Sequence, residues 1–255
     1  MKFKHITTSP FLVFRSACLA TLLLLPVTPL RAQDDTLPMS DKPVTGPLHF
    51  LSSGKPDATT LLAPPPLVGS PEQIAEMDEV KTVYHAVTEI EKQTAYAEKK
   101  FTVFNFTEAV GPYFVATNLP KTAAFFKKVQ LDGEIVTDLG KLFFKRPRPY
   151  TTDTNLANGK LEKSYSYPSG HSTESMVLAL VLADLLPDQH DAIIAHARTI
   201  GWHRVQIARH YPSDILAGRT LAQNIVQAFR QNDDYQKEFA EVKAELEAAR
   251  SAAKN

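Results

Sequence analysis

Residues 167–187 read YPSGHSTESMVLALVLADLLP, and the apolar part of this stretch decides the class of fold. The run 172–186 is shorter than the about 20 apolar residues that cross a bilayer, and it contains two acidic side chains. We therefore predict a helix buried in the core of a globular protein. Pro187 suits the first turn of a helix, and it begins the next predicted one, which runs to about Arg209.

Helical periodicity continues toward the C-terminus. Pro212 begins another predicted helix, with apolar positions at Ile215, Leu216, Ile225, Val226 and Phe229. The chain ends in an amphipathic segment whose narrow apolar stripe predicts a surface helix packed on the domain. The stripe consists of Phe239, Val242, Leu246 and Ala249.

On the N-terminal side, helix signals start at Ser70-Pro71-Glu72-Gln73, where Ser70 can cap and Gln73 can complete a capping box. Apolar residues then recur at spacings of three and four, which predicts one buried helical face over 70–90. The face consists of Ile74, Met77, Val80, Tyr84, Val87 and Ile90. Between residues 101 and 144, two prolines indicate breaks, so we predict at least two helices there.

No segment alternates apolar and polar residues between hairpin turns, and glycine is scarce, with 10 residues in 255. These features predict an all-α fold, a single helical-bundle domain over residues 70–250. Residues 33–69 are rich in proline, which opposes regular helix, so we predict an extended arm or linker. Its segments His49-Phe50-Leu51 and Leu61-Leu62 are apolar enough to lie against the domain.

Residues 1–32 are predicted to be an export signal. Basic residues precede the apolar stretch 17–26, and Leu30-Arg31-Ala32 supplies a small-residue cleavage site. A membrane anchor is the alternative, but the apolar run is well short of the about 20 residues of a span. We expect cleavage near Ala32 and no stable membrane insertion.

Charge and cysteine content narrow the function classes. Removing residues 1–32 takes away four of the 28 basic residues and none of the 28 acidic ones, which leaves a net charge of about −4. A mildly acidic protein is a poor general binder of nucleic acid, which requires a basic surface. The one cysteine, Cys18, lies inside the predicted signal, so the mature chain has no disulfide and no thiolate for metal binding or catalysis.

Two segments carry groups that suit a phosphate. In Lys141-Leu-Phe-Phe-Lys-Arg-Pro-Arg148-Pro149, a helix end passes into a proline-locked turn, so Lys141 and Arg148 can converge on one anion. The alternative interpretation is a solvated basic turn. In Pro168-Ser169-Gly170-His171, the backbone N–H groups of Ser169 and Gly170 can point at an anion, although the serine can equally be a simple helix cap.

A third segment places Arg204 six residues before His210 and Asp214 four residues after it. Pro212 begins a helix between the histidine and the aspartate, so the carboxylate can accept one imidazole N–H. That bond would fix the tautomer and leave the other ring nitrogen with its lone pair. Taken alone, this spacing is more often structural than catalytic.

Taken together, the three motifs resemble the type 2 phosphatidic acid phosphatase (PAP2) superfamily, which also contains vanadium haloperoxidases. Flanking segments, including the arm with Pro64-Pro65-Pro66 and Leu119-Pro120-Lys121-Thr122, resemble bacterial class A non-specific acid phosphatases. The resemblance covers roughly residues 48–248. It implies a periplasmic or secreted, all-helical enzyme that hydrolyses many phosphomonoesters with no metal and no cofactor, and it implies a homodimer.

The resemblance also implies roles for individual residues. His210 would attack phosphorus to give a phosphohistidine, Asp214 would orient it, and His171 would protonate the leaving alkoxide. The phosphoryl oxygens would be bound by Lys141, Arg148, Arg204 and the backbone N–H groups of Ser169 and Gly170. The chain departs from the family at His203, where the family usually has serine, and a packing role is the interpretation favoured for this histidine.

Other functions fit less well. A metal-dependent hydrolase would use His171, His203, His210 and Asp214 as ligands, but three cations in the same site would repel a metal ion. Chain length and the phosphatase-like flanks disfavour vanadate-dependent haloperoxidase chemistry, and the presence of two histidines disfavours a phosphate-binding protein without catalysis. A phosphatase for lipid head groups or diphosphates is the nearest alternative, although no further spanning segment is predicted.

Overall fold

The computed structural model describes residues 40, 42–98 and 100–253. The predicted signal peptide 1–32, and residues 33–39 and 41 of the predicted arm, lie outside the described residues. Within the described part of the chain the regular elements are helices and no strand is present, so the all-α prediction is confirmed. Among the same residues, no helix combines the length and the apolar character needed to cross a bilayer.

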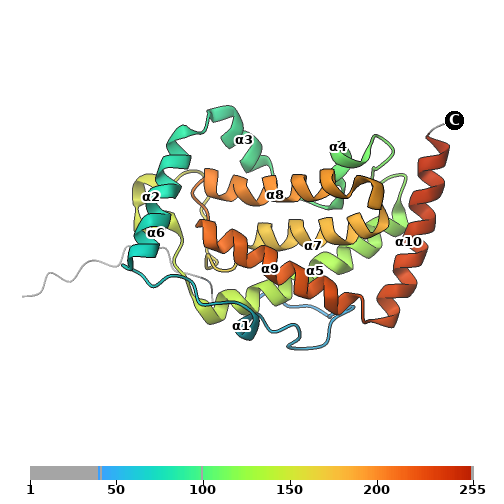
Figure 1. Ribbon diagram of the computed structural model, residues 1–255, viewed down its shortest axis with the longest axis horizontal. Helices are drawn as coiled ribbons and strands as arrows, with labels where there is room; N and C mark the ends of the chain where they lie inside the picture. Colours follow the sequence, from blue (N-terminus) through green and yellow to red (C-terminus); the bar gives the residue numbers. More distant parts are fainter. Residues whose placement is uncertain (1–39, 41, 99, 254–255) are drawn as a thin grey trace, which may run out of the picture. The chain divides into compact units, whose positions relative to one another are not determined.

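The predicted core helix is α7 (Gly170–Leu185), whose buried apolar side chains include Val177, Leu178 and Val181. It packs against α5 (Pro120–Phe144), α8 (His190–Gln206) and α9 (Pro212–Phe229) (Figure 1). The cause is compositional, because a helix that is apolar on every side is stable only when other helices cover it. These four helices form the bundle that was predicted from the sequence.

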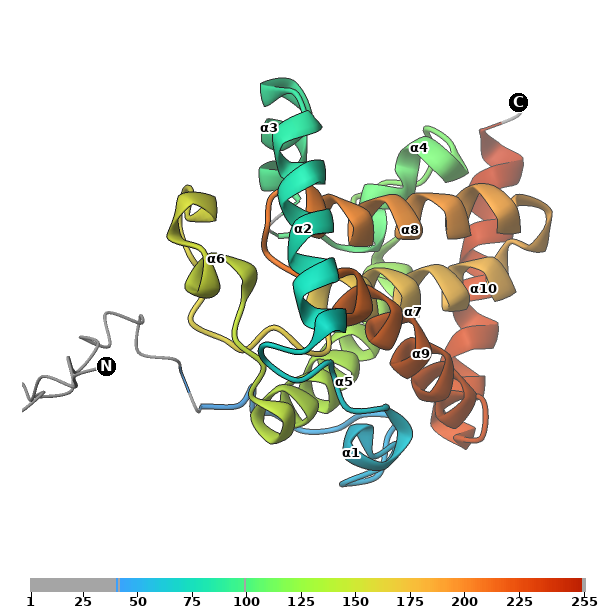
Figure 2. The same cartoon turned by 60° about the vertical axis from the view of Figure 1, so that its left-hand side comes forward.

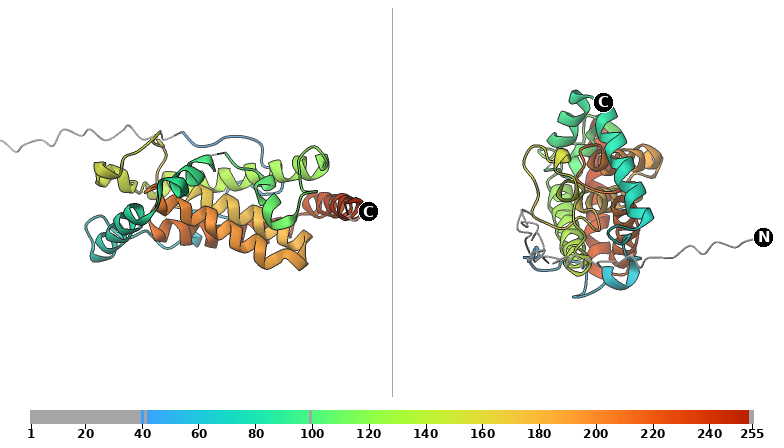
Figure 3. Two further views of the ribbon diagram at one scale, coloured as in Figure 1. Left: turned by 90° about the horizontal axis from the view of Figure 1, so that it is seen from above. Right: turned by 90° about the vertical axis from the view of Figure 1, so that its left-hand side faces the viewer.

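Four helix ends meet at one end of this bundle. Helices α5 and α8 finish there, and α7 and α9 begin there (Figures 1 and 2). The same end carries α2 (Pro71–Ala86), α3 (Glu89–Ala97) and the short α6 (Pro149–Thr152). Helix α10 (Asp233–Ala252) lies at the opposite end and packs on α5 (Figure 3). Its residues Val242 and Leu246 are buried, as its apolar stripe predicted.

The prediction of one buried helical face over residues 70–90 is wrong in part. The helix stops at Ala86, and a capping box made by Thr88 and Glu91 starts α3. As a result Ile90 is 76% exposed, and Ile74 is also largely exposed, while Met77 and Val80 are buried. At the start of α2 the Oγ atom of Ser70 caps the helix as predicted, but the Gln73 side chain accepts the N–H of Gly69 instead of closing the box.

The described part of the arm packs on the bundle. Its one helix is α1 (Ala58–Leu61), and its residues Phe50 and Leu62 are buried in the core. The carboxylate of Asp132 in α5 accepts the backbone N–H groups of His49, Phe50 and Leu51 at 2.9, 2.8 and 3.1 Å. A segment without regular structure is held in this way, because the carboxylate supplies the acceptors that a helix or sheet would supply.

The remaining elements are short. Pro112 and Pro120 do mark breaks, since two single-turn helices precede the 25 residues of α5. Those two are η1 (Val103–Phe106) and α4 (Thr107–Val110), and two further turns are η2 (Thr154–Leu156) and η3 (Pro187–Gln189).

Helix α9 passes very close to the start of α7, and Gly218 permits this approach. A Cβ atom on Gly218 would lie 2.9 Å from the carbonyl oxygen of Ser169 and 3.0 Å from the amide nitrogen of Thr173. Both neighbours are backbone atoms of the first turn of α7, so neither can move aside by changing a rotamer. This glycine therefore fixes how deeply the N-terminus of α7 sits against α9.

We predict that Gly218→Ala lowers the free energy of unfolding by about 1–3 kcal/mol, the usual cost of overpacking. Urea unfolding of the variant and the wild type measures this difference in the free energy of unfolding. The control is Gly133→Ala, because a Cβ there would meet only the Val177 side chain, at 3.8 Å. That control should be neutral or stabilising by up to about 1 kcal/mol, since alanine favours the helix. Equal stabilities of the two variants would contradict the prediction.

Candidate active site

The three sequence motifs meet where the four helix ends converge. His171 lies in the first turn of α7 and Asp214 in the first turn of α9. Lys141 lies in the last turn of α5, and Arg148 is the residue that precedes α6. His210 lies between α8 and α9. The turn before it contains Ala208 with φ of 54°, a left-handed conformation that a residue with a Cβ atom rarely adopts.

The two ring nitrogens of His210 have different surroundings. Nδ1 lies 3.3 Å from the carboxylate oxygen Oδ2 of Asp214, and Nε2 lies 3.1 Å from Nη1 of Arg148. The carboxylate can only accept, so this contact favours the tautomer with a proton on Nδ1. Nε2 then carries the lone pair, and it is directed at the guanidinium that was predicted to bind phosphate.

The electrostatics keep this histidine neutral. Burial, and next the positive charge of Arg148, lower the pKa of His210 to about 4. Although burial opposes its ionisation, the bond from His210 and the charge of Arg146 hold the pKa of Asp214 at about 2. At every pH above about 4 the pair is a neutral imidazole beside a carboxylate, which is the form that a nucleophile requires.

Two residues that position Asp214 were not predicted from the sequence. Arg146 is 4% exposed, and its guanidinium donates to Asp214 Oδ1 and to Glu76 Oε2, both at 2.6 Å. The Glu76 carboxylate in turn accepts the backbone N–H of Ser213 at 2.7 Å. Ser166, the second, donates its hydroxyl to Asp214 Oδ2. Arg146 lies inside the first motif, but the sequence pattern does not show that its role differs from that of Arg148.

His171 faces the site without a partner. Its Nε2 is buried, and no hydrogen-bond partner for it exists among the described residues. Its ring packs on Phe101 with the ring centroids 5.7 Å apart. Burial, followed by the charge of Arg204, lowers the pKa of His171 well below its ordinary value. The imidazole is therefore neutral in the protein alone, so a protonated His171 requires an added negative charge nearby.

The predicted anion cradle is formed in part. The amino group of Lys141 lies 3.3 Å from the point that a Cβ atom on Gly170 would occupy, so the lysine and the start of α7 are adjacent. Burial and the nearby charge of Arg148 lower the pKa of Lys141. The prediction for the Ser169 N–H needs correction, because it donates to the backbone carbonyl of Asp214 at 3.1 Å. The α7 terminus therefore offers the N–H groups of Gly170 and His171 instead.

Arg204 is bound by the end of α3. Its Nη2 donates to Glu98 Oε2 at 2.8 Å and to the carbonyl of Ala95, both from the end of α3. His203 binds the same glutamate, with Nδ1 2.7 Å from Oε1. The helix α3 is thus anchored to the end of α8, and the packing interpretation of His203 agrees with this contact.

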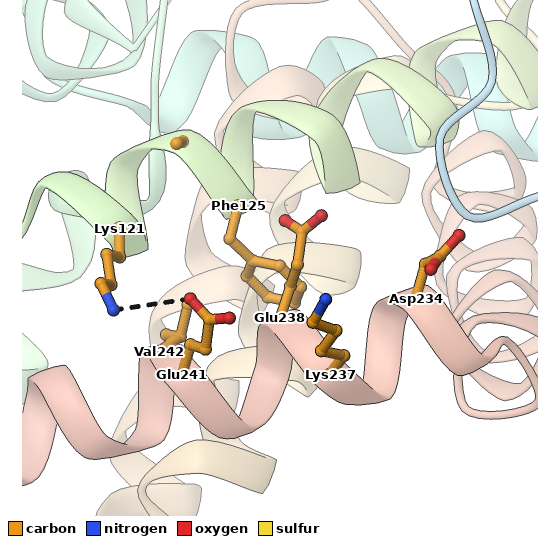
Figure 4. A pocket seen from close by; sticks show the side chains of 8 residues that line it. Lys121, Phe125, Asp234, Lys237, Glu238, Glu241 and Val242 are labelled. Atoms are coloured by element: carbon orange, nitrogen blue, oxygen red, sulfur yellow. Dashed lines mark hydrogen bonds and ion pairs between the residues drawn. The ribbon is translucent and has the colours of Figure 1, made fainter.

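A separate groove of about 360 Å³ lies between α5 and α10 (Figure 4). The ion pair of Lys121 and Glu241, 3.5 Å apart, crosses it, and Phe125 and Val242 also line it. None of the residues of the three motifs lines this groove. Within residues 40, 42–98 and 100–253, no group of three or more His, Cys, Asp or Glu side chains is placed to hold a metal ion.

Comparison with known proteins places the site in a family. The model of the PAP2 superfamily matches residues 130–236, a range that contains all eight residues predicted for the site. An acid phosphatase of Zymomonas mobilis is 29% identical over 218 residues, which cover 80% of each chain. A non-specific acid phosphatase of Providencia stuartii is 30% identical over 147 residues, which cover 55% of this chain and 59% of that protein.

A shorter similarity extends to a different group of phosphatases. A lipid A 1-phosphatase of Rhizobium etli is 45% identical over 53 residues, which cover 21% of this chain and 23% of that protein.

The buried network around Asp214 leads to a stability prediction. We expect Arg146→Met to lower the free energy of unfolding by about 3–5 kcal/mol, because the buried Asp214 carboxylate and the partly buried Glu76 carboxylate lose their counter-charge. Arg230→Met is the control, since the pair of Arg230 and Asp184 is exposed and should contribute at most about 1 kcal/mol. Urea unfolding of both variants tests this, and a cost below 1 kcal/mol for Arg146→Met would contradict it.

Proposed function

Residues 130–236 of this chain form a PAP2 superfamily domain, which confirms the resemblance inferred from its motifs, and we propose that the protein is an exported acid phosphatase acting through a phosphohistidine. Its similarity to bacterial acid phosphatases supports phosphatase chemistry. One observation carries the mechanism: the lone-pair nitrogen of His210 lies 3.1 Å from Arg148, while its other nitrogen faces Asp214.

The first half-reaction uses both histidines. Nε2 of His210 attacks phosphorus, and the bond from phosphorus to the ester oxygen breaks. The charge on the phosphoryl oxygens is stabilised by Lys141, Arg148 and the N–H groups that begin α7. The leaving oxygen takes the proton of His171. Since burial, and next the charge of Arg204, holds His171 neutral in the free protein, the doubly charged phosphate of the substrate is what raises its pKa.

The second half-reaction returns the enzyme to its starting state. A water molecule attacks phosphorus, and His171, now neutral, takes a proton from it. The bond from phosphorus to Nε2 of His210 breaks, and inorganic phosphate leaves. The Asp214 carboxylate remains ionised throughout, so it stabilises the His210 ring each time that ring becomes positively charged.

The proposal includes location, substrate and cofactor. We propose that residues 1–32 direct export to the periplasm or the medium, and that the mature protein hydrolyses small phosphomonoesters of broad range. No metal is required in this mechanism, because Lys141, Arg148 and Arg204 supply the positive charge that a metal ion would supply. On the family resemblance we also propose a homodimer.

A second candidate is a phosphatase for phosphates on lipid head groups. The similarity to a lipid A 1-phosphatase, 45% identical over 53 residues, favours it. Activity on lipid A or on a phosphorylated lipid in detergent, exceeding that on soluble esters, would favour this candidate over the first.

The nucleophile can be tested directly. We expect the purified mature protein to hydrolyse phenyl phosphate in EDTA, and an acid-labile phosphoenzyme to be trapped by rapid quenching. Both activity and trapped phosphate should disappear in His210→Ala, because no other group takes over the attack. His190→Ala is the control, since this exposed histidine pairs with the exposed Asp191, and it should behave as wild type. Loss of activity in EDTA, or activity in His210→Ala, would reopen the metal-dependent alternative.

The pKa of His210 sets the acid limit of the reaction. Below pH about 4 its imidazole is protonated and has no lone pair, so kcat/KM should fall about tenfold for each further pH unit. On the alkaline side, loss of the His171 proton in the complex should lower kcat, which gives an acidic-to-neutral optimum. An NMR titration of the His210 ring in the free protein separates its ionisation from that of the substrate, and a midpoint at pH 6.5 or above would contradict this assignment.

A further inference from the structure

A cavity of about 240 Å³ lies beside the reaction centre and is not used by the mechanism above. Arg204, from the end of α8, and Arg209, which immediately precedes His210, form one side of it. Lys160 and Glu162, from the loop between α6 and α7, form another side. No motif covers this loop, and Arg209 lies inside the third motif without a role predicted for it.

Both arginines carry a nitrogen without a partner. Arg209 is 2% exposed and Arg204 is 3% exposed. Nη1 of Arg209 and Nε of Arg204 are buried, and the described residues provide no acceptor for either. A buried donor without an acceptor is costly, and a charged one more so. Two such donors, on two residues that line one cavity, point to a site that an anion would complete.

Glu162 shows where that anion would lie. Its Oε2 is 3.1 Å from Nε of Arg209 and 4.0 Å from Nη1 of Arg148. Although burial opposes ionisation, the charges of Arg148 and Arg209 lower the pKa of Glu162, so the group is a carboxylate. The carboxylate thus lies between the guanidinium of Arg148, which contacts His210, and the guanidinium of Arg209, which belongs to the cavity. A substrate with a second negative group would join the same two guanidinium groups.

Substrate binding would disturb this internal contact. A phosphoryl group held by Arg148 places negative charge beside the Glu162 carboxylate, and like charges at this distance repel. Glu162 lies on a loop and is 30% exposed, so it can turn toward solvent. Arg209 would then be left buried without its counter-ion, unless the substrate itself supplied one.

We propose that this cavity is a second anion subsite, which binds a phosphate or carboxylate group carried by the leaving group of the ester. The inference rests on the proposed function, and it names the class of substrate that the enzyme prefers: small phosphomonoesters with a second anionic group a few bonds from the reacting phosphate. Arg209 and Lys160 bind that group, and Glu162 occupies its place in the free protein.

A matched series of substrates tests the proposal with the full mature protein. Ethyl phosphate, phosphoglycolate and ethane-1,2-diol bisphosphate share a two-carbon leaving group and differ in whether it bears no charge, a carboxylate or a phosphate. The measured quantity is the ratio of kcat/KM for each charged substrate to kcat/KM for ethyl phosphate. We expect ratios of about ten or more, since charge-assisted hydrogen bonds are stronger than neutral ones. The larger of the two ratios identifies which anion fits.

Four variants assign the effect to the cavity. Lys160→Met should lower the ratio about threefold, whereas Lys163→Met, on an exposed lysine of the same loop that does not line the cavity, should leave it unchanged. Arg209→Met should lower the ratio about tenfold. Glu162→Gln should raise it severalfold, because the competing charge is removed while the side chain keeps its size. Use of a ratio cancels any general loss of activity in a poorly folded variant.

The outcomes separate this inference from the proposed function. If ethyl phosphate is hydrolysed and His210→Ala abolishes the reaction, the proposed function stands whatever the ratios are. Ratios near one in the wild type, or ratios that Lys160→Met, Arg209→Met and Glu162→Gln leave unchanged, would then overturn the second subsite alone. Failure of wild type on all three substrates would overturn both proposals.

Discussion

The carboxylate of Asp214 is the point on which the reaction centre depends. It is fully buried, and it accepts hydrogen bonds from the Arg146 guanidinium, the Ser166 hydroxyl and the backbone N–H of Tyr211. These donors come from the turn after α5, the loop before α7 and the start of α9. One ionised group therefore holds three separate parts of the chain. The same carboxylate also contacts the ring of His210 and so positions it.

A consequence of this arrangement is that the site is built around excess positive charge. Lys141, Arg148 and Arg204 lie near two buried histidines. Burial, and next the charge of Arg204 for His171 and of Arg148 for His210, lowers the pKa of each ring. Such a site costs stability when no anion is present, because like charges are confined at low dielectric. Phosphate relieves that repulsion as it binds. Affinity for the substrate and the protonation of His171 therefore have the same electrostatic origin.

Many of the helices, and the meeting of the three motifs, could be predicted from the sequence because they depend on residues close together in the chain. Apolar runs identified α7, prolines marked the starts of α5 and α9, and the three motifs brought the right segments to one end of the bundle. The break at Val87 was a local signal that was overlooked, because the capping box of α3 joins Thr88 to Glu91 three residues later. The other failures depended on tertiary partners, as where the Ser169 N–H is taken by a carbonyl of α9. Neither the bond of Arg146 to Glu76 nor the proximity of Glu162 to Arg148 has a local signature, because each joins residues far apart in the chain.

The bonds from Asp132 to the arm bear on the order in which the molecule assembles. The three N–H groups at residues 49–51 find their acceptor 81–83 residues later in the chain. During synthesis from the N-terminus, at about 5–20 residues per second, the arm has nothing to dock on until α5 has followed it. The arm is thus the first described segment to be made and cannot be fixed early. Long-range contacts of this kind form slowly, and the proline-rich composition of the arm opposes regular helix and sheet until α5 is available.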